Sequence, residues 1–473
     1  MSELAYASLS VLAEGLASGR FSAVELARLY LDRIERANAA LHAYVAVDAE
    51  GALSLAQAAD GRRARGYTLG PLDGLPIALK DLCEVRGTMT TAGSQAWIDR
   101  ASETTGVVAH RLVQAGMVVL GKTHMVEFAF GGWGTNPVMG TPRNPWDAQA
   151  HRVPGGSSSG SGVAVAAGLA PAAIGSDTGG SVRIPAALNG ITGLKTTCGV
   201  ISRDGAVALS QTLDSIGPLT RDVRDAMLIT QALAGPDAAD PVTLGAPAFR
   251  IESPRASAAP LAGTRIAVMP PEAYPIAVSP AITRAMSDAR AVLSGLGAEV
   301  FECEVPFDFH AMMLANGRII AAEAYALHRA YIEDPALPLG QYVRARVLGG
   351  KTISAADYLE ALREHAQTRA RWQQWMAQYD ALLTPALPFE ARRLDEVDEN
   401  ATPLAAFSRA GNFLGACGLS LPAGHGEHGL PVAVQLLGKP FDEATLGRIG
   451  IAFQAVSDWH RRTPDLRAFG LAD

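Results

Sequence analysis

Hydrophobic residues near the start of the chain recur at helical spacing. The apolar positions that set this spacing are Leu12, Leu16, Val24, Leu26, Leu29 and Ile34. Because residues three and four apart share one helix face, the pattern predicts a pair of helices within residues 7–39. Ser22 stands where the second helix would begin and is expected to cap it.

Short apolar runs replace this periodicity further along the chain. Residues 75–79 read LPIAL and are followed by Lys80 and Asp81, which predicts a buried strand with two charges at its end. Residues 106–115 fit a helix, and residues 117–120 fit the strand that follows it.

The next hundred residues mix glycine-rich and apolar segments. Residues 131–162 are rich in Gly, Ser, Asn and Pro and are expected to be loop. The Ala-rich run 163–169 predicts a buried helix, and 172–175 predicts a strand that leads into a glycine turn at 177–181. Alternation of short strands and helices predicts an α/β fold around a sheet.

The second half of the chain has a different pattern of apolar and polar residues. Residues 235–262, rich in Pro, Ala, Gly and Asp, are expected to be a connector. The segment 264–308 again has an α/β pattern, and 309–378 is mostly helical. Short strands are predicted at Leu382–Leu383 and at Val432–Leu436, so one compact unit with a long middle section is expected.

Composition narrows the class of protein. The 473 residues are 48% hydrophobic and 18% charged, which allows a large core and excludes global disorder. A formal net charge of −7 argues against a nucleic acid partner. No stretch reaches the roughly 18 apolar residues that span a membrane, so a cytoplasmic protein is expected. The cysteines are far apart, as in reduced cytosolic proteins: Cys83, Cys198, Cys303 and Cys417.

The first glycine-rich candidate is a phosphate loop. Residues 116–123 read GMVVLGKT and match the string GxxxxGK[ST]. The four middle residues are apolar, so the predicted strand occupies the place where a phosphate-binding loop would lie. We therefore expect Lys122 to be structural.

The second candidate is a nucleophile elbow. Residues 156–160 read GSSSG, which would make Ser158 the nucleophile of an α/β-hydrolase. Such an elbow needs a strand that runs directly into the turn. The preceding residues 147–154 are polar and end in proline, so this interpretation is disfavoured.

The third candidate combines two glycine-serine clusters, at 154–162 and 176–183. Flexible linkers have a similar composition, but they do not usually alternate with Ala/Val runs that must be buried. A tight Asp-Thr-Gly-Gly-Ser turn presents consecutive backbone N–H groups. Such a concave arrangement suits a developing oxyanion beside a serine.

These clusters resemble the amidase signature family. The similarity extends over residues 155–197, over GLPIALKD at 74–81 and over the tail at 415–438. It implies an α/β/α fold in which helices sandwich a mixed, twisted sheet. It also implies a single domain over 1–473. In that domain the core is at about 65–235, a looser section at about 264–378 and a C-terminal return at 379–473.

The resemblance also implies the site residues. The family's triad falls on Lys80, Ser157 and Ser181, with Ser181 as nucleophile and a cis peptide between Gly156 and Ser157. The oxyanion donors would be the backbone N–H groups of four consecutive residues, Thr178, Gly179, Gly180 and Ser181. Asp177 and Arg183 flank the nucleophile and are expected to position it. Neither a metal nor another cofactor is implied.

The chemistry follows from these residue types. A serine hydroxyl attacks an amide only when a base takes its proton. A free lysine has a pKa near 10.4, which leaves less than about 0.1% neutral at pH 7. Burial at the end of an apolar strand would lower the pKa of Lys80. Ser157 can accept one proton and donate another, and so bridge Lys80 and Ser181.

The segment before the first serine cluster lines the acyl pocket in this family. Ala129, Phe130, Gly131 and Gly132 are the candidates for pocket contacts, together with Ser157. Trp133 fits either the pocket or the core. The apolar character favours a small neutral, possibly aryl, acyl group. The triad leaves amide, carbamate and ester substrates open, since all pass through the same oxyanion.

Three further interpretations differ in their partners. The glutaminase subunit of a tRNA-dependent amidotransferase is the main alternative, but residues 309–335 lack its tyrosine-rich pattern. A fatty amide hydrolase would carry a membrane anchor. A non-catalytic scaffold would have lost a triad residue. A stand-alone amidase is therefore expected, with a small-molecule amide as its partner and possibly as a homodimer.

Overall fold

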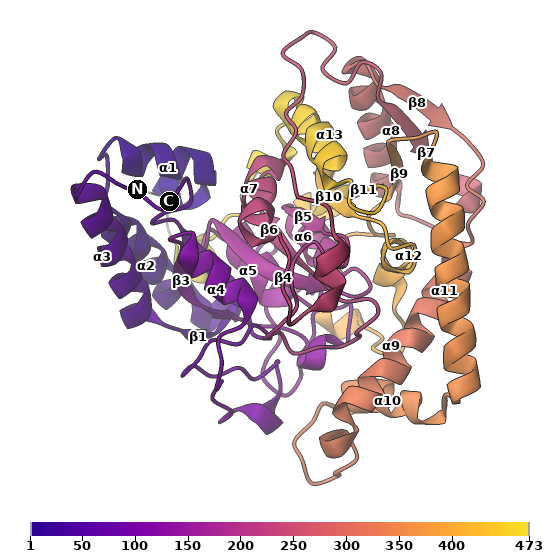
Figure 1. Ribbon diagram of the computed structural model, residues 1–473, viewed down its shortest axis with the longest axis horizontal. Helices are drawn as coiled ribbons and strands as arrows, with labels where there is room; N and C mark the ends of the chain where they lie inside the picture. Colours follow the sequence, from indigo (N-terminus) through magenta and orange to yellow (C-terminus); the bar gives the residue numbers. More distant parts are fainter. Residues whose placement is uncertain (1, 472–473) are drawn as a thin grey trace.

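Eleven strands form one mixed sheet at the centre of the molecule (Figure 1). The computed structural model describes residues 2–471. The strand order is β1-β3-β2-β4-β6-β5-β10-β11-β9-β7-β8. The strands are β1 (Tyr44–Val47), β2 (Pro76–Lys80), β3 (Val118–Thr123), β4 (Ala172–Asp177), β5 (Thr192–Lys195), β6 (Ser215–Thr220), β7 (Arg265–Val268), β8 (Glu299–Glu302), β9 (Ala381–Pro385), β10 (Gly418–His425) and β11 (Pro431–Leu437).

Helices cover both faces of this sheet, which confirms the predicted α/β class. The helices are α1 (Leu9–Ala17), α2 (Ala23–Leu41), α3 (Ala49–Ala64), α4 (Val107–Gln114), α5 (Ser159–Ala166), α6 (Arg183–Asn189), α7 (Val223–Leu233), α8 (Pro280–Gly295), α9 (Phe309–Ile332), α10 (Gln341–Gly349), α11 (Ala355–Met376), α12 (Arg409–Phe413) and α13 (Glu443–Val456). The predicted first pair corresponds to α1 and α2, and Ser22 caps α2 in a reciprocal capping box with Glu25.

Successive side chains of strand β5 point to opposite faces of the sheet. A Cβ added to Gly193 would lie 2.6 Å from the Cβ of Ala186 in α6. The next residue, Leu194, packs in the same core cluster as Met227 of α7. Because side chains alternate along a strand, α6 and α7 must lie on opposite faces.

The register of β2 and β4 creates the setting of the site. These strands are parallel neighbours, and Leu79 is paired with Ile174. Parallel neighbours end at the same edge of a sheet. Lys80, at the end of β2, therefore lies beside the last residues of β4, Ser176 and Asp177.

Helix α5 begins earlier than the sequence pattern predicts. It starts at Ser159, inside the segment 131–162 that was expected to be loop, and all of its residues are buried. A Cβ on Gly160 would overlap the carbonyl oxygen of Ala43, so glycine is needed for the helix to approach β1. The glycines and serines that resembled loop are the small residues of a tightly packed helix. Strand β1 and helix α3 were not predicted at all.

The middle section of the chain extends the same sheet. Strands β7 and β8 add to β9 at one edge, while α9, α10 and α11 pack together beside it (Figure 1). Arg36 of α2 donates a hydrogen bond to the carbonyl oxygen of Gly470, so residues near 470 lie beside the N-terminal helices. Within residues 2–471 no helix is both long and apolar enough to cross a membrane.

Candidate active site

The Lys80 side chain is completely buried at the end of β2. Its Nζ donates hydrogen bonds to Ser157 Oγ at 2.7 Å and to Ser176 Oγ at 2.8 Å. Burial lowers the pKa of Lys80 to about 7, although Cys83 and Asp214 oppose the shift. The amine is therefore about half neutral at pH 7, as a general base requires.

The segments that carry the two predicted serines lie next to each other. The backbone N–H of Ser158 donates to the carbonyl oxygen of Ser181 at 3.2 Å, which joins the two glycine-serine segments. Ser157 is fully buried and follows a cis peptide bond, as the family resemblance implied. Ser181 is 8% exposed and lines a pocket. Ser181 thus lines the pocket, whereas Lys80 and Ser157 are fully buried and are not part of its lining.

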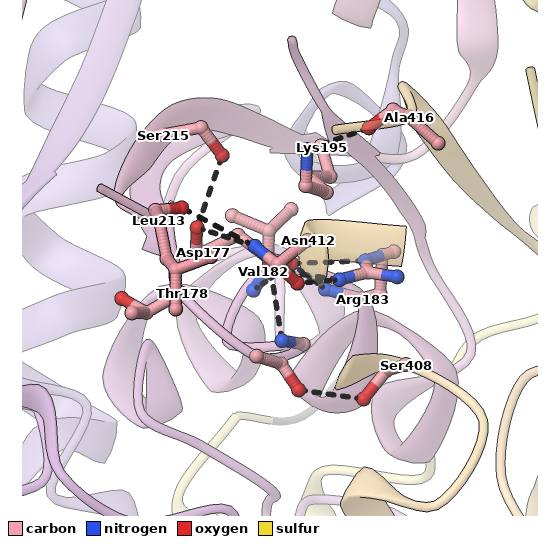
Figure 2. A network of polar contacts seen from close by, with 12 residues as sticks. Asp177, Thr178, Val182, Arg183, Lys195, Leu213, Ser215, Ser408, Asn412 and Ala416 are labelled. Carbon is pink, nitrogen blue, oxygen red and sulfur yellow. Dashed lines mark hydrogen bonds and ion pairs between the residues drawn. The ribbon is translucent and has the colours of Figure 1, made fainter. Parts of the chain in front are cut away.

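Asp177 holds the turn that carries Ser181 (Figure 2). Its carboxylate accepts hydrogen bonds from the N–H groups of Gly180 at 2.8 Å and Val182 at 3.1 Å. Arg183 Nη2 lies 2.8 Å from Asp177 Oδ1 in a buried ion pair. Burial alone would raise the pKa of Asp177, but the charge and hydrogen bonds of Arg183, the charge of Lys195 and the N–H of Val182 together hold the pKa below its usual value. The carboxylate therefore stays ionised and fixes the turn.

Two residues from the C-terminal part of the chain complete this network. Arg183 Nη1 donates to Gln435 Oε1 at 2.7 Å, and Arg183 Nη2 donates to Asn412 Oδ1 at 2.6 Å. Asn412 also donates to the carbonyl oxygen of Asp177 (Figure 2). Neither Asn412 nor Gln435 was predicted, because no local motif distinguishes them from ordinary polar residues.

The glycine turn is also fixed from the side of α12. Ser408 Oγ donates to the carbonyl oxygen of Gly179 at 2.7 Å. Gly180 has φ +125°, and a Cβ there would overlap Ser408 Oγ. Thr178 Oγ1 donates to the buried Asp214 at 2.5 Å. Only glycine at position 180 combines this backbone conformation with this close approach.

The pocket beside Ser181 contains the four predicted wall residues and two unpredicted cations. The predicted residues are Ala129, Phe130, Gly131 and Gly132. Arg346 of α10 and Arg409 of α12 line the same pocket. The pocket is therefore less apolar than expected, because residues distant in the sequence bring charge to it. Trp133 belongs to the core, since its Nε1 donates to Ala401 and its ring stacks on Phe389.

The disfavoured candidates have structural roles. Lys122 lies in β3, and its Nζ donates to Thr90 Oγ1 at 2.8 Å and approaches Asp81 at 3.8 Å. Asp81 is buried, so it supports the packing of this edge and is not a solvated residue. Ser158 is completely buried, and its hydroxyl donates to the carbonyl oxygen of Ser176.

Comparisons with known proteins agree on one family. The family model described as Amidase matches residues 25–446. A glutamyl-tRNA(Gln) amidotransferase subunit of Cupriavidus necator is 40% identical over 494 aligned positions, with 97% of this chain and 98% of that protein covered.

Solved structures of similar proteins have the same fold. One, from a vestigial protein complex that is reported to reveal the evolutionary origins of an s-triazine catabolic enzyme, has a TM-score of 0.86 and 34% identity. The match covers 95% of this chain and 99% of that one. The corresponding glutamyl-tRNA(Gln) amidotransferase subunit of Thermotoga maritima has a TM-score of 0.80 and 30% identity, with 96% and 95% of the chains covered.

The comparisons correct the expected partners. Relatives that match nearly the full chain are named as subunits, and one similar structure is a protein complex. The expectation of a small-molecule amide and possibly a homodimer as the only partners is therefore wrong. The missing tyrosine pattern at 309–335 was also insufficient to dismiss the amidotransferase interpretation, since these relatives match across that segment.

Proposed function

The chain belongs to the amidase family, and from this premise we propose that it is the amide-hydrolysing subunit of a multi-subunit enzyme. The single observation that carries the catalytic part is the 2.7 Å hydrogen bond between Lys80 Nζ and Ser157 Oγ, in the segment next to that of Ser181. A scaffold without catalysis would not need a buried lysine held between serine hydroxyls. Ser181 is the proposed nucleophile.

The proposed reaction begins with two proton transfers. Neutral Lys80 takes the hydroxyl proton of Ser157, and Ser157 takes the hydroxyl proton of Ser181. The Ser181 oxygen then forms a bond to the amide carbon, and the carbonyl electrons move to its oxygen. When the C–N bond breaks, the proton returns through Ser157 to the leaving nitrogen. Water then attacks the ester by the same route and releases the acid.

Backbone N–H groups of the glycine turn are the proposed oxyanion donors. The Gly180 N–H already donates to Asp177, so we assign the contacts to the N–H groups of Thr178, Gly179 and Ser181. Asp177 and Arg183 then act as positioning residues, because their buried ion pair fixes the turn without contact with the substrate.

Similarity to the amidotransferase subunits supports a role within a complex over that of a stand-alone amidase. The relative in Cupriavidus necator and the similar structure from Thermotoga maritima both have this name. An amidotransferase-type role, in which a partner protein receives the released ammonia, is therefore the favoured alternative to hydrolysis alone. In either role Ser181 performs the same acyl transfer.

The catalytic part is tested by active-site labelling. A fluorophosphonate probe followed by peptide mass mapping should modify Ser181 in the wild-type protein and nothing in Ser181→Ala. Labelling should persist in Ser158→Ala, the neighbouring serine whose hydroxyl bonds to Ser176. Modification of Ser158 in place of Ser181 would contradict the proposal.

The multi-subunit part is tested by the mass of the native assembly. The chain, tagged at its own chromosomal locus and purified at low salt, should carry a second polypeptide at fixed stoichiometry. Adding that polypeptide back to the isolated chain should raise kcat/KM for glutamine or another primary amide. A lone chain with full activity would contradict this part and leave the Ser181 assignment intact.

A further inference from the structure

Arg409 is a cation placed directly beside the proposed oxyanion donors. It is the first residue of α12, it is half-buried, and it lines the pocket that contains Ser181. A Cβ on Gly179 would lie 3.0 Å from Arg409 Cγ and 3.5 Å from its Nε. The side chain therefore passes within van der Waals distance of the turn that carries the nucleophile.

Two glycines make room for this side chain. Besides Gly179, Gly317 in the interior of α9 would place a Cβ 3.0 Å from Arg409 Nη1. Glycine inside a helix is about 1 kcal/mol less favourable than alanine. Glycine at position 317 therefore lowers the stability of helix α9. The absence of a Cβ there leaves space for the guanidinium of Arg409.

The guanidinium of Arg409 has no counter-ion within residues 2–471. Its one hydrogen bond to the protein runs from Nη1 to the carbonyl oxygen of Met313 at 3.3 Å. By contrast, Arg183 is paired with Asp177, and Arg346 is paired with Glu399 at 2.7 Å. Burial and the nearby Arg346 lower the pKa of Arg409 to about 10, which still leaves it charged at pH 7.

A charge that is removed from water without a partner is costly, and Arg409 lines the pocket that contains Ser181. We propose that Arg409 binds an anionic group, a carboxylate, on the acyl part of the substrate. The substrate class is then the monoamides of short dicarboxylic acids. This inference rests on the proposed function, because it concerns the substrate of the same Ser181 reaction.

The other pocket residues limit the substrate further. Besides the two arginines, the lining consists of glycine, apolar and hydroxyl residues, and no acidic side chain is among them. The carboxylate of Glu399 is already bound by Arg346. An α-ammonium group would have no anionic partner there, so an acid amide without an amino group should be preferred over the zwitterion glutamine.

The test compares matched substrates with the protein as purified, including any other polypeptide that accompanies it. Succinamate and butyramide have similar size and differ by a carboxylate in place of a methyl group. We expect kcat/KM to be at least about tenfold higher for succinamate, as for a charge-assisted hydrogen bond. Glutaramate, which is glutamine without its amino group, should exceed glutamine.

Variants of Arg409 test whether this residue causes the preference for succinamate. Arg409→Met should lower the ratio of the two kcat/KM values, succinamate over butyramide, by about tenfold or more, mainly through KM for succinamate. Arg409→Lys should restore part of the ratio, because it keeps the charge. Arg318→Met is the matched control, since Arg318 lies exposed on α9 outside the pocket and its loss should leave the ratio unchanged.

The outcomes separate this inference from the proposed function. Equal kcat/KM for succinamate and butyramide, or an unchanged ratio in folded Arg409→Met, would overturn the inference while hydrolysis itself remained. Preference for glutamine over glutaramate would overturn it as well. Absence of Ser181 labelling and of hydrolysis with every amide would instead contradict the proposed function. Fluorophosphonate labelling of each variant identifies those that have lost their fold.

Discussion

Lys80 Nζ lies 2.7 Å from Ser157 Oγ, and its second acceptor is also a hydroxyl, that of Ser176. Neither acceptor carries a negative charge, so little in direct contact favours the ammonium over the amine. Burial is then the dominant influence on Lys80, and it lowers the pKa to about 7. This relationship would make a lysine usable as a base, and three predictions follow from it.

Removal of the Lys80 amine should abolish most of the activity. Lys80→Met is expected to lower kcat by about 10²–10⁴-fold, because general-base catalysis contributes that much. The change removes a buried amine, so thermal stability should be retained. Lys351→Met, at an exposed lysine of the surface, is the control. Steady-state amide hydrolysis measures the effect, and activity within tenfold of wild type would contradict the assigned base.

The pH dependence should reflect the lowered pKa of Lys80. The base acts when neutral, so kcat/KM should rise as pH increases through about 7 and level off above it. A lysine with its ordinary pKa would instead give a rise near pH 10. The pH profile of kcat/KM for a primary amide measures this dependence. The residual activity of Lys80→Met should not show the rise near pH 7.

Neighbouring serines should differ sharply in their effects. Ser157→Ala interrupts the proton path between Lys80 and Ser181 and should lower kcat by about 10²-fold or more. Ser158→Ala removes only hydrogen bonds to the backbone of Ser176 and should cost less than about tenfold. Measurements of kcat for the two variants under the same conditions test this difference. Equal losses would exclude a special role for Ser157.

The ion pair of Asp177 and Arg183 should matter for stability as well as activity. Asp177→Asn leaves the buried guanidinium without its anion, which should lower the free energy of unfolding by about 3–5 kcal/mol. Asp395→Asn, in an exposed pair with Arg393, should cost less than about 1 kcal/mol. Urea unfolding of the two variants provides the comparison. Similar losses would contradict the structural importance of the buried pair.

Much of the site could be predicted from contiguous sequence. The triad and the glycine turn belong to two segments whose local pattern is specific, and the strand ahead of Lys80 ends where the apolar run ends. The start of α5 could not be predicted in this way. Glycine and serine are typical of loops, whereas here Gly160 lets a helix approach the backbone of Ala43 and His124, which lie far away in the sequence.

The residues that complete the site lie far away in the sequence. Asn412 reaches Arg183 from α12, and Gln435 reaches it from β11, so both come from the C-terminal part of the chain. Arg346 and Arg409 enter the pocket from α10 and α12, which no periodicity relates to Ser181. The pocket is less apolar than expected because the expectation rested on residues 126–137 alone.

The sequence by itself determined the class of chemistry, because a nucleophile, its bridge and its base depend on residue type within short motifs. The tertiary structure decided the state of those groups. The pKa of Lys80 depends on burial by the surrounding core, and the charge of the pocket depends on helices that arrive from elsewhere in the chain. Electrostatics acts through space and not along the chain, so the candidate base could be identified from the sequence whereas the charged lining of the pocket could not.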